Sequence, residues 1–188
     1  TGARVTLRGV LVRGNHHVGV IAYGPEAAVD VRDVMVLETR RGLPDATGAS
    51  LVAHTGGRVT GDHVALSNDI DVALQAYGRG ASITLADAWM RPFSAGPRPR
   101  GLGAVAAADG VVTLTRAAMV DVDGAGLAAL QAEGSPGASS LTATDVFVSA
   151  VTPRRFIGSD DPFAYALTVD RAAMALTRAT VLGGEFGF

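Results

Sequence analysis

One short pattern of apolar residues recurs along the chain. Apolar side chains take the first, third, sixth and eighth places of the pattern, as in Val5, Leu7, Val10 and Val12. Each half alternates with a period of two, which is typical of a strand with one buried face. The step of three between the halves indicates a tight bend that keeps both apolar sets inward. The pattern begins at Val5, Val29, Val59, Ile83, Val112, Leu141 and Met174, and Gly61 takes one of its apolar places.

A third apolar segment follows each copy of this pattern, and a glycine often closes it, as in "AYG" at 22–24. We take its inward residues to be Val18, Val20 and Ala22; Leu51 and Ala53; Val72, Leu74 and Ala76; Val105 and Ala107; Ala128, Leu130 and Ala132; and Leu167 and Val169. Each repeat then has three short strands and three turns. Stacked repeats of this kind predict an all-β fold, a three-sided parallel solenoid of about seven rungs, with strands about 4.8 Å apart.

Other architectures fit the pattern less well. The segments are short, rich in β-branched residues and interrupted by glycine, which disfavours helices. A β-sandwich or a propeller is the structural alternative, although neither requires seven matching columns. We expect a single domain over residues 1–188. Neither end shows a capping helix, so we expect an uncapped fragment whose remaining chain supplies further rungs.

Composition removes several classes of function. The net charge is −2 and Lys and Cys are absent, which disfavours nucleic-acid binding and excludes a Schiff-base lysine, disulfides and thiolate metal ligands. No apolar run is long enough to predict a membrane-spanning helix.

Stacking turns equivalent positions into columns. The bend column is Gly9, Asp33, His63, Asp87, Arg116, Asp145 and Arg178, and its alternating charges predict a surface ladder that fixes register. The outward column of the second strand is unusually apolar, and we expect a loop, another part of the chain or a partner to cover it. That column is Leu11, Met35, Ala65, Trp89, Ala118, Phe147 and Thr180.

The apolar columns, the glycine-closed third strand and the position of the long connections resemble the right-handed parallel β-helix proteins of the pectate-lyase-like superfamily. The long connections, at 38–48, 92–101 and 150–162, fall between the second and third strands. Insertions on one face of a repeat protein often form its binding face, although loop insertions also cost little. The resemblance implies a right-handed helix and a protein that acts on, or attaches to, polysaccharides or surfaces.

Most catalytic motifs of such enzymes are missing, since the chain has no Gly-His-Gly and no Arg-x-Lys. The candidate catalytic residues are Asp160, Asp161, Arg154 and Arg155, which share one long connection. Neighbouring carboxylates can bind Ca²⁺ and arginine can hold a uronate carboxylate. A solvated loop is the alternative interpretation. We otherwise expect no metal and no cofactor.

The candidate ligand-binding residues are Tyr23, His54 and Tyr77, which fall in one outward column on consecutive rungs. They predict either a sugar-stacking strip or a cross-strand aromatic ladder. Our leading hypothesis is a non-catalytic scaffold within a larger secreted or cell-surface bacterial protein, with a glycan or protein partner. The alternatives are a polysaccharide lyase or hydrolase acting through residues 150–162, and a self-assembling filament unit.

Overall fold

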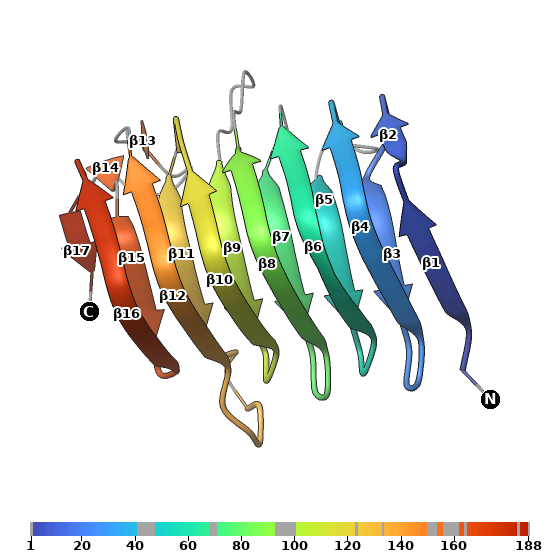
Figure 1. Cartoon of the computed structure of the whole chain (residues 1–188). Helices are drawn as coiled ribbons and strands as arrows, with labels where there is room; N and C mark the ends of the chain where they lie inside the picture. The colour runs from blue at the N-terminus through green and yellow to red at the C-terminus, as the bar shows by residue number, and fades with distance from the viewer. Residues whose placement is uncertain are drawn as a thin grey trace.

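The protein is all-β, with two stacked parallel sheets and no helix in the part of the chain that the structure describes (Figure 1). This computed structural model describes residues 2–40, 48–67, 71–92, 101–122, 124–132, 134–149, 154–155, 162–163, 165–183 and 185–187. The arrangement is compatible with a parallel β-solenoid, as the repeated apolar pattern predicted.

The first sheet, which we call sheet A, contains the long strands. Its order is β1-β4-β6-β8-β10-β12-β16, with β2 also beside β4, and its described pairs are parallel. The strands are β1 (Arg4–Arg8), β2 (Leu11–Arg13), β4 (Ala28–Leu37), β6 (Arg58–Ser67), β8 (Ser82–Arg91), β10 (Val111–Met119), β12 (Ser140–Ser149) and β16 (Ala173–Leu182).

The second sheet, sheet B, stacks behind sheet A and is also parallel (Figure 1). Its order is β17-β15-β11-β9-β7-β5-β3. The strands are β3 (Val18–Tyr23), β5 (Ala49–His54), β7 (Val72–Tyr77), β9 (Leu102–Ala107), β11 (Ala125–Leu130), β15 (Tyr165–Asp170) and β17 (Glu185–Gly187). A separate antiparallel pair joins β13 (Arg154–Arg155) to β14 (Pro162–Phe163).

The predicted bend lies inside the strands of sheet A. From β4 onward the first two expected strands form one continuous kinked strand, so a repeat has two strands rather than three. The kinks occur at residues with left-handed backbone, from Gly9 (φ 59°) and Asp33 (φ 52°) to Arg178 (φ 51°). Such residues turn the chain without breaking the ladder, so apolar residues point inward on both sides of the kink.

The predicted register of sheet A is confirmed. Val59 pairs with Val29 and Ile83, and Thr60 beside it pairs with Asp30 and Thr84. The inward side chains form one continuous core between the sheets. Its largest fully buried members are Leu51, Leu66, Leu74, Ile83, Leu85, Met90, Leu114, Met119, Leu127 and Leu141.

Part of the inward set predicted for sheet B is wrong by one residue. The partners of inward Leu74 and Ala76 are Ala104 and Ala106, and the next strand places Leu127 and Ala129 there. Val105, Ala107, Ala128 and Leu130 therefore face outward, and Ala132 follows the strand. Val18 and Val72, which were also predicted to be inward, pack in a second cluster outside the core. The outward face is itself apolar, with Ala49, Val52, Val72, Val105 and Ala128 forming a second buried cluster. Because apolar residues lie on both faces, the alternation of polar and apolar residues cannot show which side chains of the strand point inward.

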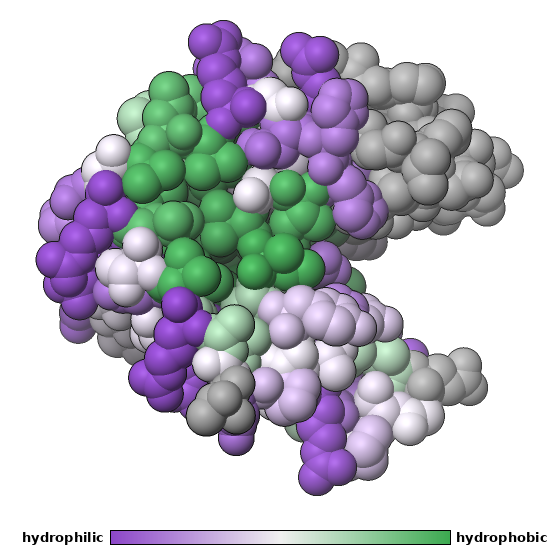
Figure 2. Space-filling view, turned by 90° about the vertical axis from the view of Figure 1, so that its right-hand side faces the viewer, coloured by the Kyte–Doolittle hydropathy of each residue, from purple (hydrophilic) through white to green (hydrophobic). Residues whose placement is uncertain are grey.

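The end of the stack nearest the N-terminus exposes apolar side chains (Figure 2). Val5 is 48% exposed, and Leu7, Val10 and Val12 are only partly buried against the core. Val5, Leu7 and Val12 pair with the buried Val29, Val31 and Val36, so their exposure follows from their place at an edge of sheet A.

Candidate functional site

The three predicted ligand-binding residues form one stack of rings. Tyr23, His54 and Tyr77 are the last residues of β3, β5 and β7, and the parallel register places them opposite one another. The Tyr23 and His54 ring centroids are 5.2 Å apart, and those of His54 and Tyr77 are 5.1 Å apart. The rings are inclined by 23° and 30°. The predicted juxtaposition is confirmed.

Within this stack His54 contacts both tyrosine rings, and Tyr77 forms the end of the stack on the side of β9. The register partner of Tyr77 on β9 is Ala107, and the next partner, on β11, is Leu130. Tyr77 and Leu130 are two strand spacings apart, about 9.6 Å. Ala107, whose side chain is a methyl group, lies between them in the register. We call the surface over Ala107, between Tyr77 and Leu130, the Tyr77 slot.

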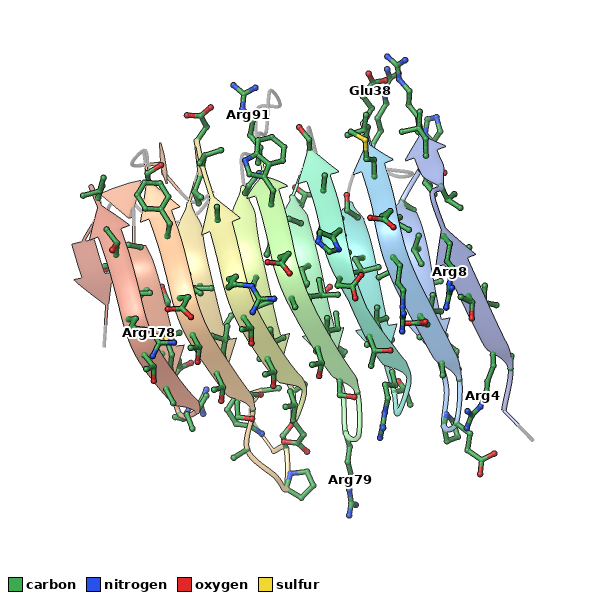
Figure 3. All side chains as sticks on the ribbon, in the orientation of Figure 1. Arg4, Arg8, Glu38, Arg79, Arg91 and Arg178 are labelled. Carbon is green, nitrogen blue, oxygen red and sulfur yellow. The ribbon has the colours of Figure 1, made fainter. Side chains whose placement is uncertain are left out.

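A cleft follows directly after the slot, at the turn between β9 and β10. The turn is tight, since the Gly110 amide donates to the Ala107 carbonyl at 3.0 Å. Arg79 projects from the neighbouring turn (Figure 3), and the longer connection between β11 and β12 lies on the other side. The cleft has a volume of about 280 Å³ and is lined by Arg79, Asp109, Pro136, Gly137 and Ala138.

Asp109 organises the wall of this cleft. Its carboxylate accepts hydrogen bonds from Gln131 Nε2 at 2.6 Å and from the Gly137 amide at 3.2 Å. Ser139 Oγ accepts from the Asp109 amide at 3.0 Å, and the Ser139 amide donates to Gln131 Oε1 at 2.8 Å. The network ties the long β11–β12 connection to the short β9–β10 turn, and so fixes the width of the cleft.

Sequence reasoning missed this network. The long connections were expected between the second and third strands, yet residues 131–139 lengthen the turn on the opposite edge of sheet B. The signal was the run "QAEGSPGASS" after the third segment, where the other repeats have a turn of a few residues. A second buried carboxylate, Asp71, was also missed, and its Oδ2 accepts from the Gly48 amide at 2.7 Å.

The candidate catalytic set is only partly placed. Asp160 and Asp161 lie outside the described residues. Arg154 and Arg155 form β13 and pair with Phe163 and Pro162 of β14. Glu38 is the first residue of the long connection at 38–48, and its carboxylate accepts a hydrogen bond from Arg13 at 2.6 Å. That bond lowers the pKa of the Glu38 carboxyl.

The predicted charge ladder is confirmed on sheet A. Arg116 donates to both carboxylate oxygens of Asp87, at 2.6 and 2.7 Å. Arg178 makes the same two-point contact with Asp145. These hydrogen bonds hold the pKa values of both carboxyls below their usual range and raise those of both guanidinium groups. His63 lies farther from its neighbour, 3.9 Å from Asp33.

The chain matches no known protein family, and comparisons with curated proteins and with solved structures likewise give no match. Among the described residues, no three or more His, Asp or Glu side chains are grouped so that they could hold a metal ion. A helix long and apolar enough to cross a membrane is also absent from that part of the chain. The Tyr77 slot and the cleft beside it are therefore interpreted from their own chemistry.

Proposed function

We propose that this chain is a rigid scaffold that binds a glycan at the Tyr77 slot. We take the fold to be a right-handed β-helix of about seven rungs, resembling the pectate-lyase-like proteins, within a larger secreted or cell-surface bacterial protein. The observation that supports the proposal is the half-exposed Tyr77 ring at the end of an aromatic stack, in register with the small Ala107, two residues before Asp109 in the lining of a polar cleft.

The chemistry of the slot suits a sugar ring. The C–H groups on one face of a pyranose pack well on an aromatic ring, and its hydroxyl groups need hydrogen-bond partners at the rim. Arg79 supplies donors there, and the carboxylate of Asp109 supplies acceptors. Tyr77 is 40% exposed, so its ring is accessible without rearrangement of the strands. Ligand sites of this type combine an apolar surface with a few placed polar groups.

The scaffold supports this role through its rigidity. Tyr77 is held by its strand and by the His54 ring, and the His54 ring in turn shares a hydrogen bond of 2.5 Å with the Thr55 hydroxyl. The opposite wall of the cleft is held by Asp109 and Gln131. Both walls are therefore fixed before a ligand arrives, which reduces the entropy lost on binding.

Calorimetric titration with cellohexaose, chitohexaose and hexagalacturonate tests the proposal. At least one should bind, and Tyr77→Ala should weaken it by about two- to tenfold, the range expected for one ring contact. Ala107→Phe should fill the slot and have a similar effect. Tyr23→Ala is the matched control, because Tyr23 lies at the other end of the stack. Failure of all three sugars to bind, or equal losses for Tyr77→Ala and Tyr23→Ala, would contradict the proposal.

A further inference from the structure

A cavity lies at the start of β1, β4 and β6, at the end of sheet A nearest the N-terminus. Its volume is about 890 Å³, within the range of small-molecule sites. The polar residues that line it come from these three strands and from the turn before β4, and they include Arg4, Thr6, Glu26, Asp30, Arg58 and Thr60. The parallel register therefore fixes most of its lining. The Tyr77 slot, by contrast, lies on sheet B.

The register places two arginines on either side of an alanine in this cavity. Arg4 pairs with Ala28, and Ala28 pairs with Arg58. The two arginines are therefore two strand spacings apart, about 9.6 Å between their Cα atoms, and the side chain between them is a methyl group. The next residues along the strands, Val29 and Val59, are buried in the core, so Ala28 and Arg58 point outward.

In the described part of the chain, neither Arg4 nor Arg58 has a carboxylate partner, and both residues are exposed. Most other arginines of sheet A are paired with an acidic residue. The pairs are Arg13–Glu38, Arg32–Asp30, Arg91–Asp121, Arg116–Asp87 and Arg178–Asp145. An anion held between Arg4 and Arg58 would supply the partner that these two guanidinium groups lack.

The two carboxylates of the cavity are already engaged. Glu26 accepts a hydrogen bond from the Gly2 amide at 3.1 Å. An Asp30 oxygen lies 3.4 Å from Arg32 Nε. Because Arg32 follows Asp30 on the outer face of β4, it draws this carboxylate along the strand and away from Ala28. The position over Ala28 is therefore left to the two arginines.

The next outward row adds further charge. Arg8, Arg32 and Asp62 are register partners on β1, β4 and β6, and Figure 3 shows Arg8 on the same strand as Arg4. Counting this row with the cavity residues gives four arginines and three carboxylates. The region therefore holds one excess positive charge before an anion binds.

We propose that this cavity binds the phosphate monoester of a small polyhydroxy molecule, with the phosphate over Ala28 between Arg4 and Arg58. Two guanidinium groups that each donate two hydrogen bonds to one phosphate lie about 8 Å apart, close to two strand spacings. A phosphate monoester has three acceptor oxygens and a second negative charge near neutral pH, whereas a carboxylate has two oxygens and one charge. The phosphate therefore satisfies both arginines better than a carboxylate does.

The rest of the cavity suits the hydroxyl groups of such a ligand. Thr6, Asp30 and Thr60 form the next row of register partners, about 6.6 Å along the strands from Ala28. The two threonine hydroxyls can donate and accept hydrogen bonds, and the Asp30 carboxylate accepts them. The cavity is larger than a phosphate group alone requires, so it can hold a ligand of the size of a sugar phosphate.

Calorimetric titration with glucose 6-phosphate at pH 7.5 and low ionic strength tests the proposal. The wild type should bind it, and Arg58→Gln should weaken binding by about tenfold, the lower end of the range for hydrogen bonds to a charged group. Ala28→Glu should abolish binding, because it places a carboxylate between the two guanidinium groups. Arg79→Gln is the matched control: it removes the charge of an exposed arginine outside the cavity and should leave the affinity unchanged.

The charge of the ligand gives a second readout. A phosphate monoester loses its second proton with a pKa of about 6, so binding should be severalfold weaker at pH 5 than at pH 7.5. None of the described residues that line the cavity is histidine. Glucose 6-sulfate carries one charge at both pH values, and should bind more weakly than the phosphate at pH 7.5.

Four results would overturn the proposal. They are no binding of glucose 6-phosphate, equal losses for Arg58→Gln and Arg79→Gln, equal affinities for the phosphate and the sulfate at pH 7.5, and inorganic phosphate that binds as tightly as glucose 6-phosphate. The last result would leave the hydroxyl groups of the ligand without a role. None of these outcomes depends on whether the Tyr77 slot binds a glycan, because the two sites lie on different sheets.

Discussion

Leu114→Ala should destabilise the protein strongly, because Leu114 lies in the middle of the inward column of sheet A. Its side chain is fully buried, and its register partners are Leu85 and Ala143. Truncation leaves a cavity that Ala143 is too small to fill and that Leu85 cannot fill without leaving its own strand position. Buried Leu→Ala changes of this kind cost about 3–5 kcal/mol. For a chain of this length, that corresponds to a loss of about 6–20 °C in Tm.

The assay is thermal and urea denaturation followed by circular dichroism, with Thr113→Ala as the matched control. Thr113 is the preceding residue of β10 and faces outward, in register with Thr84 and Thr142, so its truncation should change stability by no more than about 0.5 kcal/mol. A loss below about 1 kcal/mol for Leu114→Ala, or an equal loss for Thr113→Ala, would refute the assignment of inward and outward faces.

Three further substitutions test separate parts of the structure. Gly61→Ala should lower Tm sharply, because a Cβ there would lie 1.9 Å from the Val31 carbonyl oxygen; an unchanged Tm would mean that β4 and β6 are farther apart. The Asp87 carboxyl has a pKa lowered below 3.8 by Arg116, so its stabilising effect is complete above about pH 4 and is lost as the pH falls through the lowered value. The Tm difference between wild type and Asp87→Asn should therefore shrink below pH 4, and a difference that is constant with pH would contradict this. Asp109→Ala should cost about 1–3 kcal/mol in urea denaturation by leaving donors unpaired, and a neutral result would show that the network does not hold the turn.

The strands of sheet A could be predicted in detail because polar and apolar residues alternate in them. Thr60 between Val59 and Gly61, and Thr113 between Val112 and Leu114, mark the outward face without ambiguity. The first residues of successive predicted repeats are therefore register partners in the structure, from Val5 and Val29 to Leu141 and Met174. The kink was visible as the step of three, although its left-handed backbone was not.

Sheet B could be predicted only in part, because its outward face is also apolar. In β9 the run Ala104–Ala107 contains no polar residue. The sequence therefore does not show whether the side chain of Val105 points inward or outward. Tyr23, His54 and Tyr77 were placed correctly because bulky polar-tipped rings near a closing glycine stand out from the alanines around them. The Asp109 network could not be found in this way, because it depends on the unequal lengths of two neighbouring turns.

The most direct test of the whole account is disulfide trapping across the predicted register, which is simple because the chain contains no Cys. Thr113 and Thr142 are register partners on β10 and β12, and neighbouring strands are about 4.8 Å apart, within the Cα separation that a disulfide allows. The double variant Thr113→Cys with Thr142→Cys should form an intramolecular disulfide on oxidation. The pair Thr113→Cys with Leu141→Cys, whose side chains point to opposite faces, should not. A disulfide in the second pair and none in the first would contradict the parallel, in-register stack.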